Sequence, residues 1–302
     1  MIYVRRTPSP QTHIPHLDLQ GRGVNRYITS LELNDKELAL LKPEFTEFNP
    51  KNKEYDLVYI VKEGNGNTDL KYSLRSICKF CEFRKVWIVG YKPNWVKDVG
   101  YIHTLQKGNK WKNSMLNYEV ACNNPEISEN FVLMNDDFFA IRQIVDWEQD
   151  TNKCLGTIPE KAKEYRIKKS ASRWQNGFIY AEQLLNDLEC KQQYNYETHL
   201  PIIINKNDFK IMLTIPAVQK FMKTDKVFHK RSIYKNLFYK NTDSEPQKIL
   251  DVKLELQKDL DSIPLTENWV SVYDYVVDNV RRYPQLNKIL RTLFAEKCRF
   301  EV

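Results

Sequence analysis

The sequence predicts a three-layer α/β fold, in which helices cover both faces of a central β-sheet. Two observations predict this class. Strand-like and helix-like segments alternate between residues 55 and 134, in the order strand, helix, strand, strand, helix, strand. The first strand-like segment is a continuous run of β-branched, aliphatic and aromatic residues, which is typical of a strand buried on both faces. After Phe138 the pattern becomes mostly helical.

The first strand spans Tyr55 to Val61 and ends in Lys62-Glu-Gly-Asn-Gly-Asn67. Apolar residues then recur with helical spacing from Thr68 to Phe83, and Asn67 or Thr68 is placed to cap this helix. Four further elements follow before Phe138, namely strands at 85–89, 101–105 and 131–134 and a helix at 113–123.

The segments outside this alternation are expected to be helical or irregular. Helices are expected at residues 181–190, 213–223, 257–262 and 273–293, the last interrupted at Pro284, with a polar loop at 239–246. The Pro-rich residues 1–54 are expected to form an arm packed on the core, with one helix at 30–42. Since no linker separates two autonomous parts, residues 55–302 are predicted to form a single domain.

The composition is that of an ordinary soluble protein of 302 residues with 42% apolar residues. No apolar run approaches the roughly 20 residues that span a bilayer. Because no apolar stretch of a signal peptide follows the start, we expect a cytoplasmic protein with its six cysteines reduced. Cys78 and Cys81 have CxxC spacing, but no second pair completes a zinc site, so we expect a structural pair.

The net charge of +7 is unevenly distributed. Lys206 to Lys240 contains nine Lys or Arg against two Asp, and Lys161 to Arg173 contains six against one Glu. Such stretches attract phosphate, sugar nucleotides, anionic polymers or nucleic acid, although a solvated basic surface gives the same pattern. Trp174 follows the second stretch and adds an aromatic face for stacking on a sugar or a base.

Two polar features follow strands of the predicted sheet, where ligands of α/β folds bind. Asp136 and Asp137 come directly after the strand at 131–134. Adjacent carboxylates are costly to bury unless a cation such as Mg²⁺ or Mn²⁺ compensates them, and such a cation can neutralise a diphosphate. Gly64 and Gly66 follow the first strand and allow close approach of a ligand to the backbone. Taken alone, each feature is equally consistent with an ordinary turn.

Taken together, several segments resemble, in order, the conserved regions of the Stealth family. That family includes bacterial capsule sugar-phosphate transferases and a GlcNAc-1-phosphotransferase. The matching segments are Asp56-Leu-Val-Tyr59, Asp69-Leu-Lys-Tyr-Ser-Leu-Arg-Ser-Ile77, Val86-Trp-Ile-Val89, Lys112-Asn-Ser114, Ile127-Ser-Glu-Asn-Phe-Val-Leu-Met-Asn-Asp-Asp-Phe-Phe139, Thr198-His-Leu-Pro201, Val270-Ser-Val-Tyr-Asp274 and Lys297-Cys-Arg-Phe-Glu301. The chain departs from the family pattern at Ile60-Val-Lys62.

The resemblance implies a single catalytic domain of GT-A-like nucleotide-diphospho-sugar transferase fold, with a UDP-sugar as the expected donor. His199 would take a proton from the acceptor hydroxyl, and Arg75 would clamp a phosphate. Lys206 and Arg231 would neutralise a phosphate or an anionic acceptor. The predicted catalytic residues are His199, Asp69 and Arg75, the predicted donor-binding residues are Tyr59, Gly64, Gly66, Asn113, Asn135, Lys206 and Arg231, and the predicted metal ligands are Asp136 and Asp137.

The function that the resemblance implies is transfer of a sugar-1-phosphate onto an acceptor hydroxyl, with release of a nucleoside monophosphate. The alternative is a glycosyltransferase that releases a nucleoside diphosphate. The expected acceptor is a capsule- or teichoic-type polysaccharide; a modified base in phage DNA also fits the basic stretches. A binding module that has kept the fold and lost the chemistry is the non-enzymatic alternative. The sequence does not indicate an oligomeric state.

Overall fold

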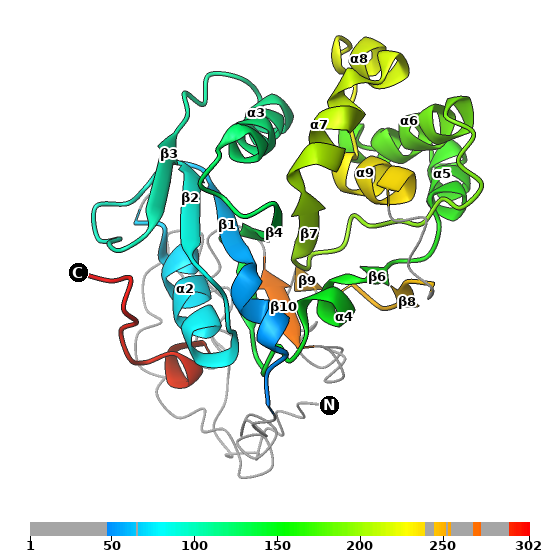
Figure 1. The fold of residues 1–302 in the computed structure, drawn as a ribbon. Coiled ribbons are helices and arrows are strands. Elements are labelled where there is room, and N and C mark those ends of the chain that lie inside the picture. Colours follow the sequence, from blue (N-terminus) through cyan, green and yellow to red (C-terminus); the bar gives the residue numbers. More distant parts are fainter. Residues whose placement is uncertain (1–46, 65, 239–244, 252, 255–267, 273–289) are drawn as a thin grey trace, which may run out of the picture.

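A computed structural model describes residues 47–64, 66–238, 245–251, 253–254, 268–272 and 290–302. Its centre is a five-stranded sheet with the strand order β3-β2-β1-β4-β7 (Figure 1). The first four of these strands are parallel, and β7 runs antiparallel to β4. The bounds are β1 Asp56–Val61, β2 Val86–Gly90, β3 Gly100–His103, β4 Asn130–Asn135 and β7 Ile202–Asn205.

The side chains of the buried strand β1 contact a different apolar cluster on each face of the central sheet. Leu57, Tyr59 and Val61 of β1 belong to one apolar cluster, whereas Val58 belongs to a second cluster on the opposite face. Helix α2 (Thr68–Phe80) packs in the first cluster and α3 (Lys110–Asn123) in the second. The three-layer α/β class predicted from the sequence is therefore confirmed.

The ends of these two helices follow from their caps. Helix α3 begins three residues before the predicted start because the side chain of Asn109 accepts hydrogen bonds from the backbone amides of residues 111 and 112. Helix α2 begins as predicted after Asn67, which adopts a left-handed conformation (φ 46°) and makes no side-chain cap. The α2 helix ends at Phe80, earlier than predicted, where the chain turns extended at Cys81.

The region after Phe138 contains more β-structure than predicted. Besides β7, it forms β5 (Phe138–Ala140), β6 (Lys153–Cys154), β8 (Gln247–Lys248), β9 (Lys253–Leu254) and β10 (Trp269–Val272). Strands β5, β10 and β9 form a second sheet, and β6 pairs with β8. Helix still predominates over strand in the described part of this region, in line with the prediction; the strands themselves were not predicted, and β7 completes the central sheet.

The helices of this region are α4 (Trp147–Thr151), α5 (Ile158–Arg166), α6 (Arg173–Asp187), α7 (Lys206–Thr214), α8 (Pro216–Met222) and α9 (Lys230–Phe238). The helix predicted at 181–190 is the second half of α6, which begins earlier because Ser172 and Gln175 form a capping box. The helix predicted at 213–223 is interrupted: α7 ends at Thr214, and Pro216 opens α8.

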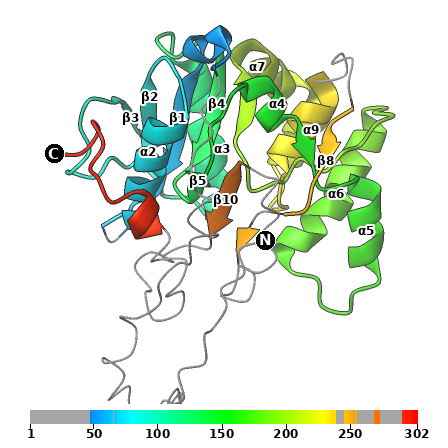
Figure 2. The ribbon, with the colours of Figure 1, turned by 90° about the horizontal axis from the view of Figure 1, so that it is seen from below.

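The C-terminal segment packs against α2. Leu290, Phe294 and Phe300 are buried in the same cluster as α2, and Figure 2 shows this segment (red) beside that helix. The 3₁₀ helix η1 (Pro50–Glu54) is held by Asn52, whose side-chain amide donates to the carbonyl oxygens of residues 144 and 145.

Several predicted features lie outside the described residues, namely the helices at 30–42 and 257–262, most of the polar loop at 239–246, residues 273–289 of the last helix and the Tyr273-Asp274 pair. None of the six cysteines, all of which lie in the described part of the chain, forms a disulfide. None of the helices in the described part of the chain combines the length and apolar character needed to cross a bilayer.

Candidate functional site

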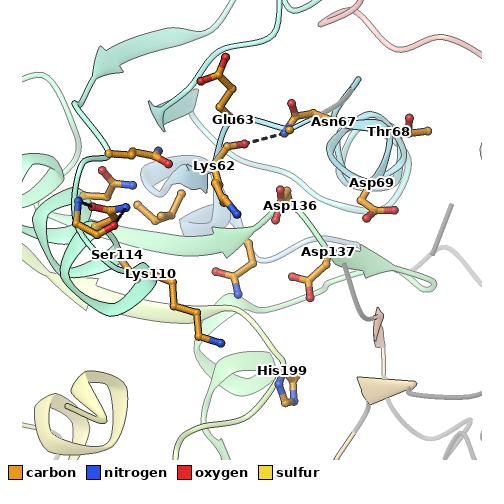
Figure 3. A pocket seen from close by; sticks show the side chains of 17 residues that line it. Lys62, Glu63, Asn67, Thr68, Asp69, Lys110, Ser114, Asp136, Asp137 and His199 are labelled. Carbon is orange, nitrogen blue, oxygen red and sulfur yellow. Dashed lines mark hydrogen bonds between the residues drawn. The ribbon is translucent and has the colours of Figure 1, made fainter. Parts of the chain in front are cut away.

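A cavity of about 780 Å³ opens at the carboxyl ends of β1 and β4 (Figure 3). It is enclosed by the loop after β1, the first turn of α2, the loop before α3, the first turns of α3, the residues after β4, and His199. The lining residues are Ile60, Lys62, Glu63, Gly64, Asn67, Thr68, Asp69, Gln106, Gly108, Lys110, Asn113, Ser114, Asn117, Asn135, Asp136, Asp137 and His199. The position is the one that strand polarity predicts for ligands of α/β sheets.

Seven of the twelve predicted site residues line this cavity, namely Gly64, Asp69, Asn113, Asn135, Asp136, Asp137 and His199. They come from segments that are up to 135 residues apart in the chain. The structure does not bring Tyr59, Gly66, Arg75, Lys206 and Arg231 into its wall.

Three carboxylates share one side of the cavity. Asp136 and Asp137 follow β4 directly, and Asp69 lies in the first turn of α2. Asp137 is 6% exposed, and one of its oxygens accepts a hydrogen bond of 3.1 Å from the hydroxyl of Ser271 in β10. A residue of the second sheet thus fixes the orientation of Asp137, which follows strand β4 of the central sheet.

These carboxylates fit a divalent cation that shares its coordination with a ligand. Hard carboxylate oxygens suit Mg²⁺ or Mn²⁺, and Mg²⁺ is commonly held by one or two carboxylates together with substrate phosphates and water. In the described residues, no group of three His, Cys, Asp or Glu side chains is placed to hold a metal ion by itself. The donor set therefore fits a cation that arrives with a phosphate-bearing ligand.

His199 lines the cavity as part of a two-residue unit. Its Nδ1 lies 2.8 and 3.0 Å from the two carboxylate oxygens of Asp251. The side chain of His199 is 25% exposed, and Figure 3 shows it on the same side of the cavity as Asp137. A carboxylate that accepts from Nδ1 sets the imidazole orientation and leaves Nε2 to exchange a proton.

A residue of helix α9 holds the loop that carries His199. The Arg231 guanidinium, which is buried, donates to the carbonyl oxygen of Thr198 at 2.6 Å and to that of Leu200. These two carbonyls flank His199 on either side. The prediction that Arg231 binds a phosphate is therefore corrected: both of its terminal nitrogens donate to the backbone, and it positions His199.

Glu197 strengthens the same attachment. Its carboxylate accepts hydrogen bonds from the backbone amide and the hydroxyl of Ser232, at 3.1 and 3.2 Å. Burial would raise the pKa of Glu197, but the charge and the hydrogen bond of His229 and the charges of Arg231 and Lys230 outweigh it and lower the pKa to about 2. This carboxylate is therefore charged at neutral pH.

Asn113 shapes the opposite wall. Its side-chain amide donates to the carbonyl oxygen of Gly108 and accepts from the Gly108 backbone amide, both at 2.8 Å. In the same wall, Gln106 donates to the carbonyl oxygen of Val61, and Asn117 accepts from Thr104. Asn113 therefore orders the loop before α3.

The remaining predicted residues have other roles. Tyr59 is fully buried, and its hydroxyl lies 3.0 Å from that of Ser73 in α2, so the prediction of donor binding is corrected to packing between β1 and α2. Gly66 adopts φ 79° in the turn before α2 and accepts a hydrogen bond from the Trp95 indole. Lys206 is buried and donates to the carbonyl oxygens of residues 124 and 127, both at 2.8 Å.

Arg75 also lies outside the cavity wall. Its guanidinium forms a two-fold contact with the carboxylate of Glu301, at 2.6 and 2.8 Å, and donates to the carbonyl oxygens of Phe294 and Ala295. The predicted phosphate clamp is therefore corrected: Arg75 fastens the C-terminal segment to α2. The Tyr-Ser-Leu-Arg and Lys-Cys-Arg-Phe-Glu segments of the family resemblance thus meet each other in the fold.

Sequence reasoning missed three residues that bear on the site. Asp251 lies 52 positions from His199 between Leu250 and Val252, and no local pattern indicates their contact. Lys110 lies in the cavity wall because α3 begins earlier than predicted. Ser271 had no assigned role, although it belongs to a segment of the resemblance.

No family model matches the sequence, and no curated protein matches it. Among solved structures, the fold is similar to the glycosyltransferase GlyE of Streptococcus pneumoniae TIGR4, with a TM-score of 0.43 and 10% identity over 82% of this chain. The chain spans 61% of the length of that structure. It is also similar to the galactosyltransferase LgtC in complex with donor and acceptor sugar analogs, with a TM-score of 0.46 and 8% identity over 80% of this chain and 96% of that one.

Proposed function

We propose that this protein is a nucleotide-sugar-dependent transferase that moves a sugar-1-phosphate onto an acceptor hydroxyl. The observation that carries the proposal is the cavity itself, which joins a carboxylate cluster to a histidine oriented by a carboxylate. The first group suits a diphosphate-bound cation, and the second suits removal of a proton from a hydroxyl. The resemblance to the Stealth segments supports the same chemistry.

The proposed reaction places the donor diphosphate between the two walls of the cavity. Asp136 and Asp137 would hold the divalent cation, which neutralises charge on the diphosphate oxygens when bound. Lys62 and Lys110 supply further positive charge in the wall. The side-chain amide of Asn67 donates to the carbonyl oxygen of Lys62, whereas that of Asn135 in the same wall would hydrogen-bond sugar or nucleotide.

Proton transfer is assigned to His199. The acceptor oxygen attacks the β-phosphorus, the bond from that phosphorus to the bridging oxygen breaks, and the nucleoside monophosphate leaves. The hydroxyl proton passes to Nε2 of His199, and Asp251 stabilises the imidazolium that forms. Arg231 holds the loop so that the imidazole keeps its place.

The test is donor consumption by the purified protein with Mn²⁺, a panel of UDP-sugars and mixed hydroxyl acceptors. His199→Ala is expected to lower turnover at least a hundredfold, since general base catalysis contributes about 10²–10⁴-fold. Asp137→Asn is expected to lose turnover and also to lose metal-dependent donor binding, measured by calorimetry. Lys168→Gln, an exposed residue outside the cavity, serves as the matched control and is expected to retain wild-type turnover. Full activity of Asp137→Asn would contradict the proposal.

A further inference from the structure

A second pocket lies on the other side of the first turn of α3. Gly108, Lys110, Asn113 and Ser114 face the large cavity, whereas Asn109, Trp111, Lys112 and Met115 line a separate pocket of about 70 Å³. The two hollows are therefore separated by little more than a single helix, which is about 10 Å across with its side chains. A molecule of modest length can reach from one to the other.

Positive charge converges on this pocket from three parts of the chain. The cations in its wall are Lys112 of α3, Arg173 at the start of α6, Lys226, and Lys230 at the start of α9. The Trp111 ring orders two cations, with the Arg173 guanidinium 5.3 Å and the Lys110 ammonium 4.6 Å from its centroid. Arg173 of the basic stretch 161–173 thus meets Lys226 and Lys230 of the basic stretch 206–240 at this pocket.

Among the described residues, the wall contains one carboxylate, that of Asp225. It lies 3.0 Å from the Arg173 guanidinium and 3.9 Å from the Lys112 ammonium, and its side chain is 75% exposed. Exposed ion pairs of this kind contribute little stability. The Asp225 carboxylate therefore occupies a position that suits an anion, and its own ion pairs there are weak.

Lys230 gives an independent indication. Burial is the main cause that lowers its pKa to about 8, despite the opposing charge of Glu197, and Arg231 adds to the lowering. Its ammonium lies 4.7 Å from the centroid of the Tyr118 ring. A partly buried cation at the edge of a pocket is stabilised by any anion that enters it.

We propose that this pocket binds a phosphate group of the acceptor, and that the acceptor is a phosphate-bearing glycan. The inference rests on the proposed function, because it places the acceptor relative to the donor cavity. The volume admits one small tetrahedral group, and Arg173 offers the planar donors that phosphate accepts. Nucleic acid is the less favoured acceptor, because it binds through many phosphates along an extended track.

The test measures binding of inorganic phosphate and of a hexose 6-phosphate by calorimetry at low salt. Arg173→Gln and Lys226→Gln are each expected to weaken binding about tenfold, which corresponds to one charge-assisted hydrogen bond. Asp225→Asn is expected to strengthen binding about threefold, because it removes a competing negative charge. Lys220→Gln, an exposed lysine of α8 outside the pocket, is the matched control and should bind like wild type.

Two readouts separate this inference from the proposed function. Binding of the phosphate probes is measured without donor, so it stands or falls independently of turnover. Hydrolysis of the donor without acceptor is expected to be unchanged in Lys226→Gln, because Lys226 lies outside the donor cavity. Unchanged phosphate affinity in both Arg173→Gln and Lys226→Gln would overturn the pocket assignment. Tighter binding of a DNA oligomer than of hexose phosphate, with loss in the same variants, would overturn the glycan assignment.

Discussion

Replacing Arg75 by Ala tests whether this residue fastens the C-terminal segment or binds substrate. The Arg75 side chain is 11% exposed and its partner Glu301 is 3% exposed, so the substitution leaves a buried carboxylate without its cation. Breaking such a pair by removing one partner costs about 3–5 kcal/mol. We expect the free energy of unfolding, measured by urea denaturation, to fall by about 3–4 kcal/mol for Arg75→Ala.

A double-mutant cycle isolates the pair. The double variant that combines Arg75→Met with Glu301→Gln leaves no unpaired buried charge. Its loss of stability is therefore expected to be at least about 1 kcal/mol smaller than the summed losses of the single variants Arg75→Met and Glu301→Gln. The exposed pair of Lys161 and Glu164, at 2.9 Å, is the matched control, and Lys161→Ala should change stability by less than about 0.5 kcal/mol. If Arg75→Ala unfolds like wild type but loses donor affinity, the structural role is refuted and the phosphate clamp is restored.

Three further predictions concern the site and its supports. Asp251→Asn is expected to lower kcat at least tenfold with little change in the KM for the donor, since it removes the carboxylate that orients His199; steady-state kinetics at several pH values checks this. The pKa of Glu197 (about 2) lies below the ordinary value of about 4.3. It therefore contributes stability that is present above about pH 4.3 and is lost as the pH falls toward 2, and Glu197→Gln should flatten the acid limb of unfolding curves in that range. Gly90→Ala is expected to destabilise by about 3 kcal/mol or more, because residue 90 has φ 112° and a Cβ there would lie 2.2 Å from the β1 carbonyl oxygen of Val61; near-wild-type thermal unfolding would contradict this close approach of the two strands.

The part of the fold that hydrophobic pattern determines was predictable. Strands β1, β2 and β4 are short apolar runs, and α2 carries its apolar residues at helical spacing. Strand β7 was missed because three consecutive isoleucines next to Pro201 do not distinguish a strand from a buried helix segment by periodicity alone. The break between α7 and α8 depends on Pro216, which is a local feature and could have been assigned.

In the candidate site too, some residues could be predicted from the sequence and others could not. Asp136, Asp137 and Asp69 could be placed because the ends of neighbouring parallel strands share one edge of a sheet. Arg75 and Arg231 could not, because nothing local shows whether a guanidinium turns toward a cavity or toward backbone carbonyls of a distant segment. Contacts between segments far apart in the chain are determined by tertiary packing, and a local sequence pattern does not predict them.

Transfer of a sugar-1-phosphate differs from glycosyl transfer in the nucleotide that is released. The protein, a UDP-sugar, Mn²⁺ and a phosphate-bearing glycan acceptor are incubated, and the released nucleotide is identified by ³¹P NMR and chromatography. We expect a nucleoside monophosphate together with a new phosphodiester signal on the acceptor, both lost in His199→Ala. Release of a nucleoside diphosphate with a new glycosidic bond would contradict it.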